Sequence, residues 1–334
     1  MKIVFTREDV EKIMNDNSSG NIIIPEGVTA IESCALENCE SLTSVIIPDS
    51  VTEIGEGAFA GCRSLESVNI PEGVKVINTE AFCNCESLTS VNIPDSVTEI
   101  GEVAFGNCES LTSVNIPKGI NKIYKGTFAG CRSLTSVIIP DSVTEIGELT
   151  FGNCESLTSV NIPKGIKVIN KGTFGGCRSL TSVTIPDSVI GIGEAAFSHC
   201  ESLKSVNIPE SVTVIAERAF YHCESLESVN IPESVTLTIS NMINRGTFEG
   251  CRSLTSVNIP ESVIRICDNA FSGCESLESV NIPDGVNYIG NCAFEDCKSL
   301  KSITIPKGVK FHWAINDIRK GIFPGCKSLT IQRR

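Results

Sequence analysis

A 23-residue repeat constrains the fold of this chain more than any other feature of its sequence. Proline recurs at this interval from Pro25 to Pro232 and continues, after one 28-residue step, as far as Pro306. One cysteine per repeat fills a second column from Cys39 to Cys326. A fixed period of roughly 20–50 residues is typical of solenoids, in which each repeat packs only on its neighbours. The 334 residues are therefore expected to form one array rather than two or three globular domains.

The segment from Leu42 to Ser64 shows how one coil is built. Val45 and Ile47 alternate with outward residues, which is the period of a half-buried strand. Pro48 is expected to end this strand, because proline has no N–H to donate to a neighbouring strand. The later spacing predicts a short extended piece and then a helical or 3₁₀ turn. The predicted inward residues of this coil are Leu42, Val45, Ile47, Val51, Ile54, Ala58, Phe59 and Cys62.

The strand pattern Leu42-x-x-Val45-x-Ile47, followed by Pro-x-Ser/Gly-Val-x-x-Ile…Ala-Phe-x-x-Cys-x-Ser-Leu, resembles the BspA-like class of leucine-rich repeats. The resemblance covers Ile22 to Ile331. It implies a β-rich repeat solenoid: a right-handed array of about 13 coils, one for each 23-residue repeat, with a parallel β-sheet on the concave face. It also implies a binding role, because members of this family are typically surface or secreted proteins that contact host proteins or other cells.

The array has a different N-terminal segment and two irregular coils. We predict that residues 1–20 form a cap, with a strand at Lys2–Phe5 and a helix that has Thr6 as its N-cap. Residues 21–334 form the solenoid, with insertions near 236–246 and 310–320. The chain stops within a strand pattern, and no C-terminal cap is evident in the sequence.

Charge and hydropathy exclude several classes of partner. The formal net charge is −13, with 27 Lys+Arg against 40 Asp+Glu, which argues against nucleic acid and anionic membranes as partners. No run of about 18 apolar residues is present, so we expect no membrane insertion. The sequence shows no secretory signal peptide, which favours a cytoplasmic location. Location at the cell surface, or secretion by an unconventional route, is the alternative.

The cysteine column has three possible roles. Adjacent parallel strands lie about 4.8 Å apart, within the Cα range of a disulfide, but side chains in register point the same way. His199-Cys200 and His222-Cys223 could together offer zinc two imidazoles and two thiolates. Neighbouring residues in an extended segment tend to face opposite sides, so we expect outward histidines, inward free thiols and no metal. The cysteines outside the column, which we expect to be more accessible, are Cys34, Cys83, Cys267 and Cys292.

The sequence contains no recognisable catalytic constellation and no glycine-rich cofactor loop, so we expect neither enzyme activity nor a cofactor. The residue after each repeat proline, from Asp49 to Lys307, is acidic in nine of twelve coils and forms a negative rim. The outward strand positions form either an amide ladder bonded to itself or a ligand-binding face. These positions are Ile46, Asn69, Asn92, Asn115, Ile138, Asn161, Thr184, Asn207, Asn230, Asn258, Asn281 and Thr304.

We therefore predict a non-enzymatic scaffold that binds a protein partner. The alternatives are a cell-surface adhesin that binds host or matrix protein, and a self-associating structural solenoid that stacks through its C-terminal coil. Interface hot spots are usually aromatic residues or arginine, which the regular columns lack, so the insertions are the predicted anchors. Local plugging of a bulged coil is the other explanation for their apolar residues. The candidate binding residues are Trp313, Phe311, His312, Leu237, Ile239 and Met242 in the insertions, and Asn69, Asn92, Asn115, Asn161, Asn207 and Asn230 on the strand face.

Overall fold

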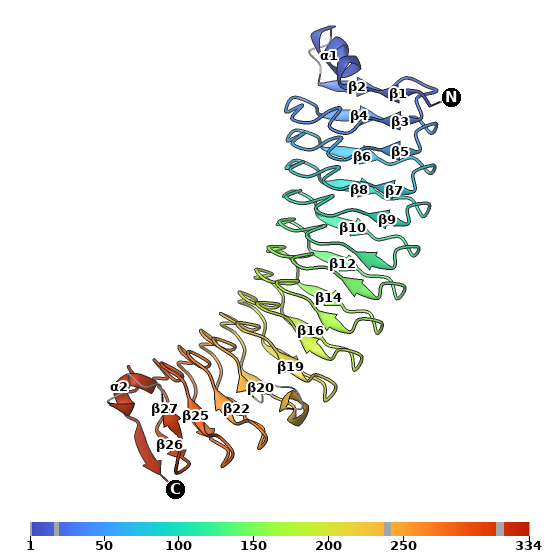
Figure 1. Ribbon diagram of the computed structural model, residues 1–334. Coiled ribbons are helices and arrows are strands. Elements are labelled where there is room, and N and C mark those ends of the chain that lie inside the picture. Colours follow the sequence, from blue (N-terminus) through green and yellow to red (C-terminus); the bar gives the residue numbers. More distant parts are fainter. Residues whose placement is uncertain (1, 17–19, 237–241, 312–316, 334) are drawn as a thin grey trace. The chain divides into compact units, whose positions relative to one another are not determined.

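The computed structural model describes residues 2–16, 20–236, 242–311 and 317–333 (Figure 1). The chain forms a parallel β-solenoid of about 13 coils, one for each 23-residue repeat, which confirms the fold that the sequence predicts. It divides into two compact units, Met1–Gly165 and Ile166–Arg334. Within the described residues, no helix is long and apolar enough to cross a membrane.

In unit 1, each coil contributes one three-residue strand to a parallel sheet, which we call the main sheet of unit 1. Its strands pair in register one repeat apart, as in Val114 with Val137. The central residue of each strand is buried and the last one is exposed. The strands are β2 (Asn21–Ile23), β4 (Ser44–Ile46), β6 (Ser67–Asn69), β8 (Ser90–Asn92), β10 (Ser113–Asn115), β12 (Ser136–Ile138) and β14 (Ser159–Asn161).

A second series of two-residue strands follows the proline turns of unit 1. These short strands are also parallel and in register, as in Ile123 with Ile146. They form one sheet in the order β1-β3-β5-β7-β9 and a separate β11-β13 pair. The strands are β1 (Val4–Phe5), β3 (Ala30–Ile31), β5 (Glu53–Ile54), β7 (Val76–Ile77), β9 (Glu99–Ile100), β11 (Lys122–Ile123) and β13 (Glu145–Ile146).

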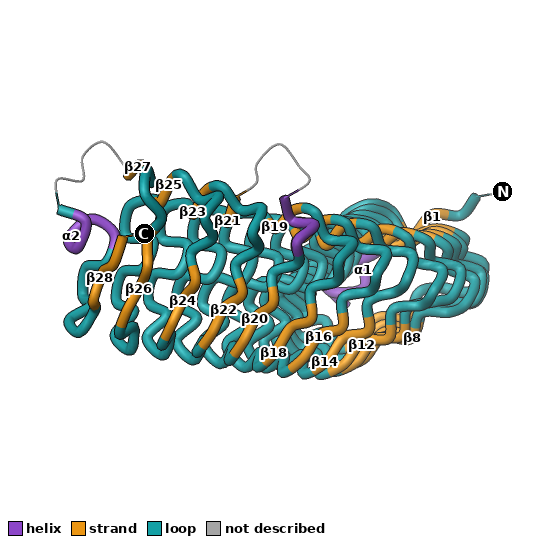
Figure 2. The backbone as a smooth tube through the Cα atoms, turned by 90° about the horizontal axis from the view of Figure 1, so that it is seen from below, coloured by secondary structure: helices purple, strands orange, loops and turns teal. Residues whose placement is uncertain are grey.

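Unit 2 repeats this plan, and Figure 2 shows its two series of strands on different sides of the coils. The insertion after β20 leaves the register intact, because Val229 still pairs with Val257 of the next coil. The main strands are β16 (Ser182–Thr184), β18 (Ser205–Asn207), β20 (Ser228–Asn230), β22 (Ser256–Asn258), β24 (Ser279–Asn281), β26 (Ser302–Ile305) and β28 (Thr330–Arg333). The short strands are β15 (Val168–Ile169), β17 (Gly191–Ile192), β19 (Val214–Ile215), β21 (Met242–Ile243), β23 (Arg265–Ile266), β25 (Tyr288–Ile289) and β27 (Lys310–Phe311).

The core is a stack of identical side chains inside the coils. All eight inward residues predicted for the coil Leu42–Ser64 are buried, each with 7% or less of its surface exposed. The phenylalanine rings stack face to face, with centroids 5.4 Å apart for Phe82 and Phe105 and 5.7 Å apart for Phe105 and Phe128. Each ring therefore buries its faces against adjoining coils, which couples neighbouring coils directly.

The turn that carries the phenylalanine differs from the prediction. The sequence suggested a helical or 3₁₀ turn, but two residues per coil have left-handed backbone angles, such as Gly57 (φ 58°) and Gly61 (φ 73°). A helix needs negative φ at every residue, so these positions exclude it. Non-glycine residues also occupy such positions, as at Asn38 and Asn107. Asparagine accepts this conformation at lower cost than most residues.

Helices occur only at three places among the described residues: α1 (Arg7–Asp16), the 3₁₀ turn η1 (Glu233–Thr236) and α2 (Ile318–Ile322). The α1 helix has the capping interactions that the sequence predicts. The Thr6 Oγ1 lies 2.8 Å from Asp9 Oδ2 and 3.4 Å from the Asp9 backbone nitrogen, so Thr6 is the N-cap. The predicted strand is shorter than expected and covers only Val4–Phe5.

Candidate binding surface

The outward face of the main sheet in unit 1 is the strongest candidate for a binding surface. The last residue of each main strand is exposed and aligned with its neighbours by the strand register, as Asn69 is with Asn92 and Asn115 with Ile138. We call this line of side chains the outer column. Its members in unit 1 are Ile23, Ile46, Asn69, Asn92, Asn115, Ile138 and Asn161.

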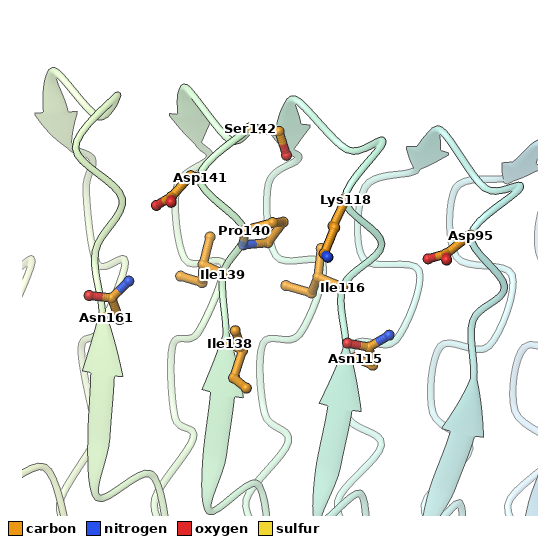
Figure 3. A pocket seen from close by; sticks show the side chains of 10 residues that line it. All are labelled: Asp95, Asn115, Ile116, Lys118, Ile138, Ile139, Pro140, Asp141, Ser142 and Asn161. Carbon is orange, nitrogen blue, oxygen red and sulfur yellow. The ribbon is translucent and has the colours of Figure 1, made fainter.

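Ile138 is the most exposed residue among the exposed large apolar side chains of the described chain, with 75% of its surface accessible. It lies beside a shallow hollow of about 470 Å³, between Asn115 and Asn161 of the adjoining coils (Figure 3). The hollow also adjoins the buried Ile116 and Ile139. Its lining residues are Asp95, Asn115, Ile116, Lys118, Ile138, Ile139, Pro140, Asp141, Ser142 and Asn161.

The amide ladder of the outer column is partial in unit 1. The Asn92 amide donates to Asn69 Oδ1 at 3.2 Å, so the predicted ladder forms there. Within the described part of the chain, Asn115 and Asn161 have no hydrogen-bond partner for their side-chain amides. Each amide offers both donors and acceptors to a ligand. The outer column therefore combines a partial ladder with free amides on both sides of an exposed isoleucine.

The rim beside the outer column is charged and accessible. Asp49, Glu72 and Asp95 follow the prolines of three successive coils, and Lys118 and Asp141 follow those of the next two. All five side chains are exposed, and none forms an ion pair within the described residues. The rim is therefore uniformly acidic beside Ile46 and of mixed charge beside Ile138. Figure 3 shows Lys118 and Asp141 on the rim side of Ile138.

The outward strand residues of unit 2 are polar. Asn207 and Asn230 are exposed, as the sequence predicts, and the Asn258 amide donates to Asn230 Oδ1 at 3.2 Å. Within the described residues, no large apolar side chain is exposed at these positions. The exposed isoleucines that distinguish the face of unit 1 therefore have no counterpart on the described main strands of unit 2.

Two of the predicted insertion residues, Met242 and Phe311, are described, and neither belongs to a main strand of unit 2. Met242 belongs to β21 and Phe311 to β27, both in the short series of unit 2. Both are half-buried with local contacts: Met242 Sδ is 3.6 Å from Cys267 Sγ, and the Arg333 guanidinium lies 5.5 Å from the Phe311 ring centroid. The other four predicted insertion anchors, Leu237, Ile239, His312 and Trp313, lie outside the described residues.

The cysteine column is packed as predicted. None of the 17 cysteines forms a disulfide, and all those of the column are buried. Cys200 and Cys223 are fully buried while His199 and His222 are partly exposed, which confirms the predicted orientation. The two imidazoles stack with centroids 5.2 Å apart, and burial, followed by the charge of His222, lowers the pKa of His199.

One cysteine outside the column was placed wrongly. Cys83 is buried, with 8% of its surface exposed, whereas Cys34 is exposed and Cys267 and Cys292 are half-buried. Cys83 occupies the coil position that Ala60 and Gly106 hold in the adjoining repeats. Neighbouring coils cover it there, so its departure from the column does not imply access to solvent.

Ile46 and Ile138, which are exposed on the main sheet, were not among the binding residues predicted from the sequence. Both belong to the predicted outward strand column, but the predicted binding residues were those of the insertions and six asparagines of that column. The signal was an isoleucine where most coils have asparagine or threonine. Lys118 carried a similar signal, because it follows three successive acidic residues on the rim.

Comparisons with known proteins agree with this geometry. The family profile described as "BspA type Leucine rich repeat region (6 copies)" matches residues 11–135, 121–242 and 241–332. A leucine-rich repeat protein from Bacteroides ovatus is 28% identical with a TM-score of 0.73, and the match covers 94% of this chain and 92% of the other. A leucine rich cell surface protein from Faecalibacterium prausnitzii is 28% identical with a TM-score of 0.55, over 95% and 88%. The comparison with curated proteins gave no match.

Proposed function

Because the chain belongs to the BspA-type leucine-rich repeat family, we propose that it is a non-enzymatic scaffold that binds a protein partner through the main-sheet face of unit 1. The family fold is typically used for protein interaction, and the solved relatives are repeat proteins rather than enzymes. The observation that carries the proposal is Ile138, which is 75% exposed between two free amides. An accessible aliphatic side chain surrounded by polar groups is suited to the centre of an interface, because removing its apolar surface from water contributes favourable binding free energy.

A photocrosslinking experiment tests this proposal. Benzoylphenylalanine is placed at Ser136, which is exposed on the same strand as Ile138, and in a second protein at Ile190, which is exposed in unit 2 outside the main strands. In cells that express the protein, irradiation should give a discrete protein adduct from position 136 and not from position 190. Ile138→Asn restores the residue of the adjoining coils, so it should keep the fold and remove the adduct. Equal adducts from both positions, or an adduct that survives Ile138→Asn, would contradict the proposal.

The insertions remain the competing location for the anchor. Trp313→Ser in the position 136 protein distinguishes the two locations, because it leaves the face of unit 1 unchanged. Under our proposal the adduct persists in this variant. Loss of the adduct with Trp313→Ser and its persistence with Ile138→Asn would place the anchor in the insertion, as the sequence analysis predicts.

A second candidate function is adhesion at the cell surface. It is supported by the 28% identity to a protein described as a leucine rich cell surface protein. The cytoplasmic location expected from the sequence is the competing proposal. Protease treatment of intact cells distinguishes the two locations. An adhesin is degraded while the cells are intact, whereas a cytoplasmic scaffold is degraded only after lysis.

A further inference from the structure

The outer column of unit 1 has aliphatic side chains at two separated places. Ile23 and Ile46 are paired in register at one end and are 66% and 59% exposed. Ile138 is four coils beyond Ile46. At about 4.8 Å per coil, Ile46 and Ile138 are roughly 19 Å apart along the column. Polar asparagines occupy the three coils between them.

We propose that this column binds one extended polypeptide segment of a partner protein, with two aliphatic side chains at positions i and i+6 that contact Ile46 and Ile138. This inference rests on the proposed function and specifies its partner. In an extended chain, residues i and i+6 point to the same side and are about 20 Å apart, which matches the separation of the two isoleucines. A helix presents same-face pairs at about 16 Å or 21 Å, which fit less well.

The polar groups of the column favour an extended segment for a second reason. An extended backbone brings N–H and C=O groups that need partners when they are covered. The Asn115 and Asn161 amides are unpaired within the described residues, and Ser67, Ser90 and Ser113 present exposed hydroxyl-bearing side chains beside the column. A helix satisfies its own backbone, so it would cover these amides without supplying backbone groups to pair with them.

The rim adds a charge requirement to the partner. Asp49, Glu72 and Asp95 accompany the column over the first three coils from Ile46, and Lys118 follows in the coil before Ile138. The three carboxylates form no ion pair within the described residues. A basic side chain between the two aliphatic residues of the segment would lie beside these carboxylates. Complementary charge of this kind accelerates association more than it adds affinity. The segment is therefore aliphatic at both ends and basic in between.

To test the inference, peptides that bind the purified full chain are selected from a displayed library of random linear peptides. Each peptide in the library is long enough to span the whole column. The selected peptides should contain two aliphatic residues at spacing i, i+6 with Lys or Arg between them. Ile46→Asn and Ile138→Asn should each weaken the selected peptides about tenfold or more, because each removes one buried aliphatic contact. Glu72→Gln should slow association. The matched control is Ile190→Thr, which removes an exposed isoleucine of unit 2 and introduces the residue that the next coil has at Thr213, and it should change nothing.

Three outcomes would overturn the inference. They are peptides with no spacing preference, peptides with the helical spacings i, i+11 or i, i+14, and peptides whose binding survives both isoleucine substitutions. Failure of this inference is distinguishable from failure of the proposed function. If the adduct at position 136 depends on Ile138 but selected peptides need only one aliphatic residue, the binding surface stands and the two-anchor segment does not.

Discussion

At the scale of the residue, the buried thiols are a repeated structural element of the coils. Column cysteines donate their Sγ–H to a backbone carbonyl of the preceding coil. Cys108 donates to Phe82 O at 3.2 Å, and Cys131 donates to Phe105 O at 3.3 Å. A cysteine is small enough for the packed interior and still satisfies this carbonyl. Burial raises the pKa of Cys85 to about 12 and raises the pKa of Cys108 and Cys131 well above the ordinary value.

These pKa values predict a loss of stability at alkaline pH. Unfolded thiols ionise above about pH 8.5 while the buried ones stay protonated, so folding is favoured fully below that pH and less as pH rises toward the folded pKa. Each such thiol should cost about 1.4 kcal/mol of unfolding free energy per pH unit above about 9. Denaturant unfolding under reducing conditions at pH 7.5, 9 and 10 measures the slope. The triple variant Cys85→Ala, Cys108→Ala and Cys131→Ala should show a shallower slope, and an unchanged slope would contradict this explanation.

At the scale of the element, the left-handed turns limit which residues can occupy the same position in two adjoining coils. Asn107 has a left-handed backbone (φ 56°) and donates its side-chain amide to Asn84 Oδ1 at 2.9 Å. In the next coil the same position is Gly130 (φ 75°), where an added Cβ would overlap Asn107 Oδ1. The same overlap occurs between Gly61 and Asn38. Glycine is favoured at these places because it adopts the left-handed backbone angle without strain and adds no side chain next to the asparagine.

Gly130→Ala should therefore destabilise unit 1 by about 1–3 kcal/mol, because alanine is strained at positive φ and its Cβ meets Asn107. The double variant Gly130→Ala with Asn107→Gly removes the overlap and should recover part of this loss. Gly130→Asn should cost less than Gly130→Ala, since asparagine tolerates the left-handed region. Thermal unfolding of the three variants checks the order. Equal melting temperatures for Gly130→Ala and the wild type would show that the turn adapts without cost.

At the scale of the whole molecule, stability is divided among neighbouring coils. Within the phenylalanine column each inner ring stacks on the rings before and after it, as Phe105 does on Phe82 and Phe128, and the main strands bond only to adjoining strands. In such an array the free energy of folding is approximately a sum of coil and nearest-neighbour terms. A defect should therefore reduce protection around itself first, and coils many repeats away should keep theirs.

Phe105→Ala tests this local behaviour. The ring is fully buried between Phe82 and Phe128, so its loss should cost about 3–5 kcal/mol through transfer and cavity terms. Hydrogen exchange should accelerate in the coils around Phe105, while the strands β22 to β26 of unit 2 keep wild-type rates. Uniform acceleration across the chain would show global cooperativity instead, and unchanged exchange near Phe105 would contradict its place in the core.

The repeat sequence by itself determined the solenoid and its interior. Proline, phenylalanine and cysteine recur in register, and only a stack of similar coils can place so many equivalent residues in equivalent surroundings. All eight inward residues predicted for one coil are buried, and Thr6 caps the first helix as its sequence indicates. These features depend on residues within one coil or one turn, where local spacing determines which side chains face inward.

Only the tertiary structure decided which exposed residues share a surface. It separated Met242 and Phe311, on short strands, from the asparagines of the main strands. It showed that Asn115 and Asn161, on either side of Ile138, have no side-chain hydrogen-bond partner within the described residues, and that neighbouring coils bury Cys83. Such features depend on contacts between residues at least one repeat apart. The exposure and pairing of a side chain are set by the coils that flank it, which a pattern within a single coil does not specify.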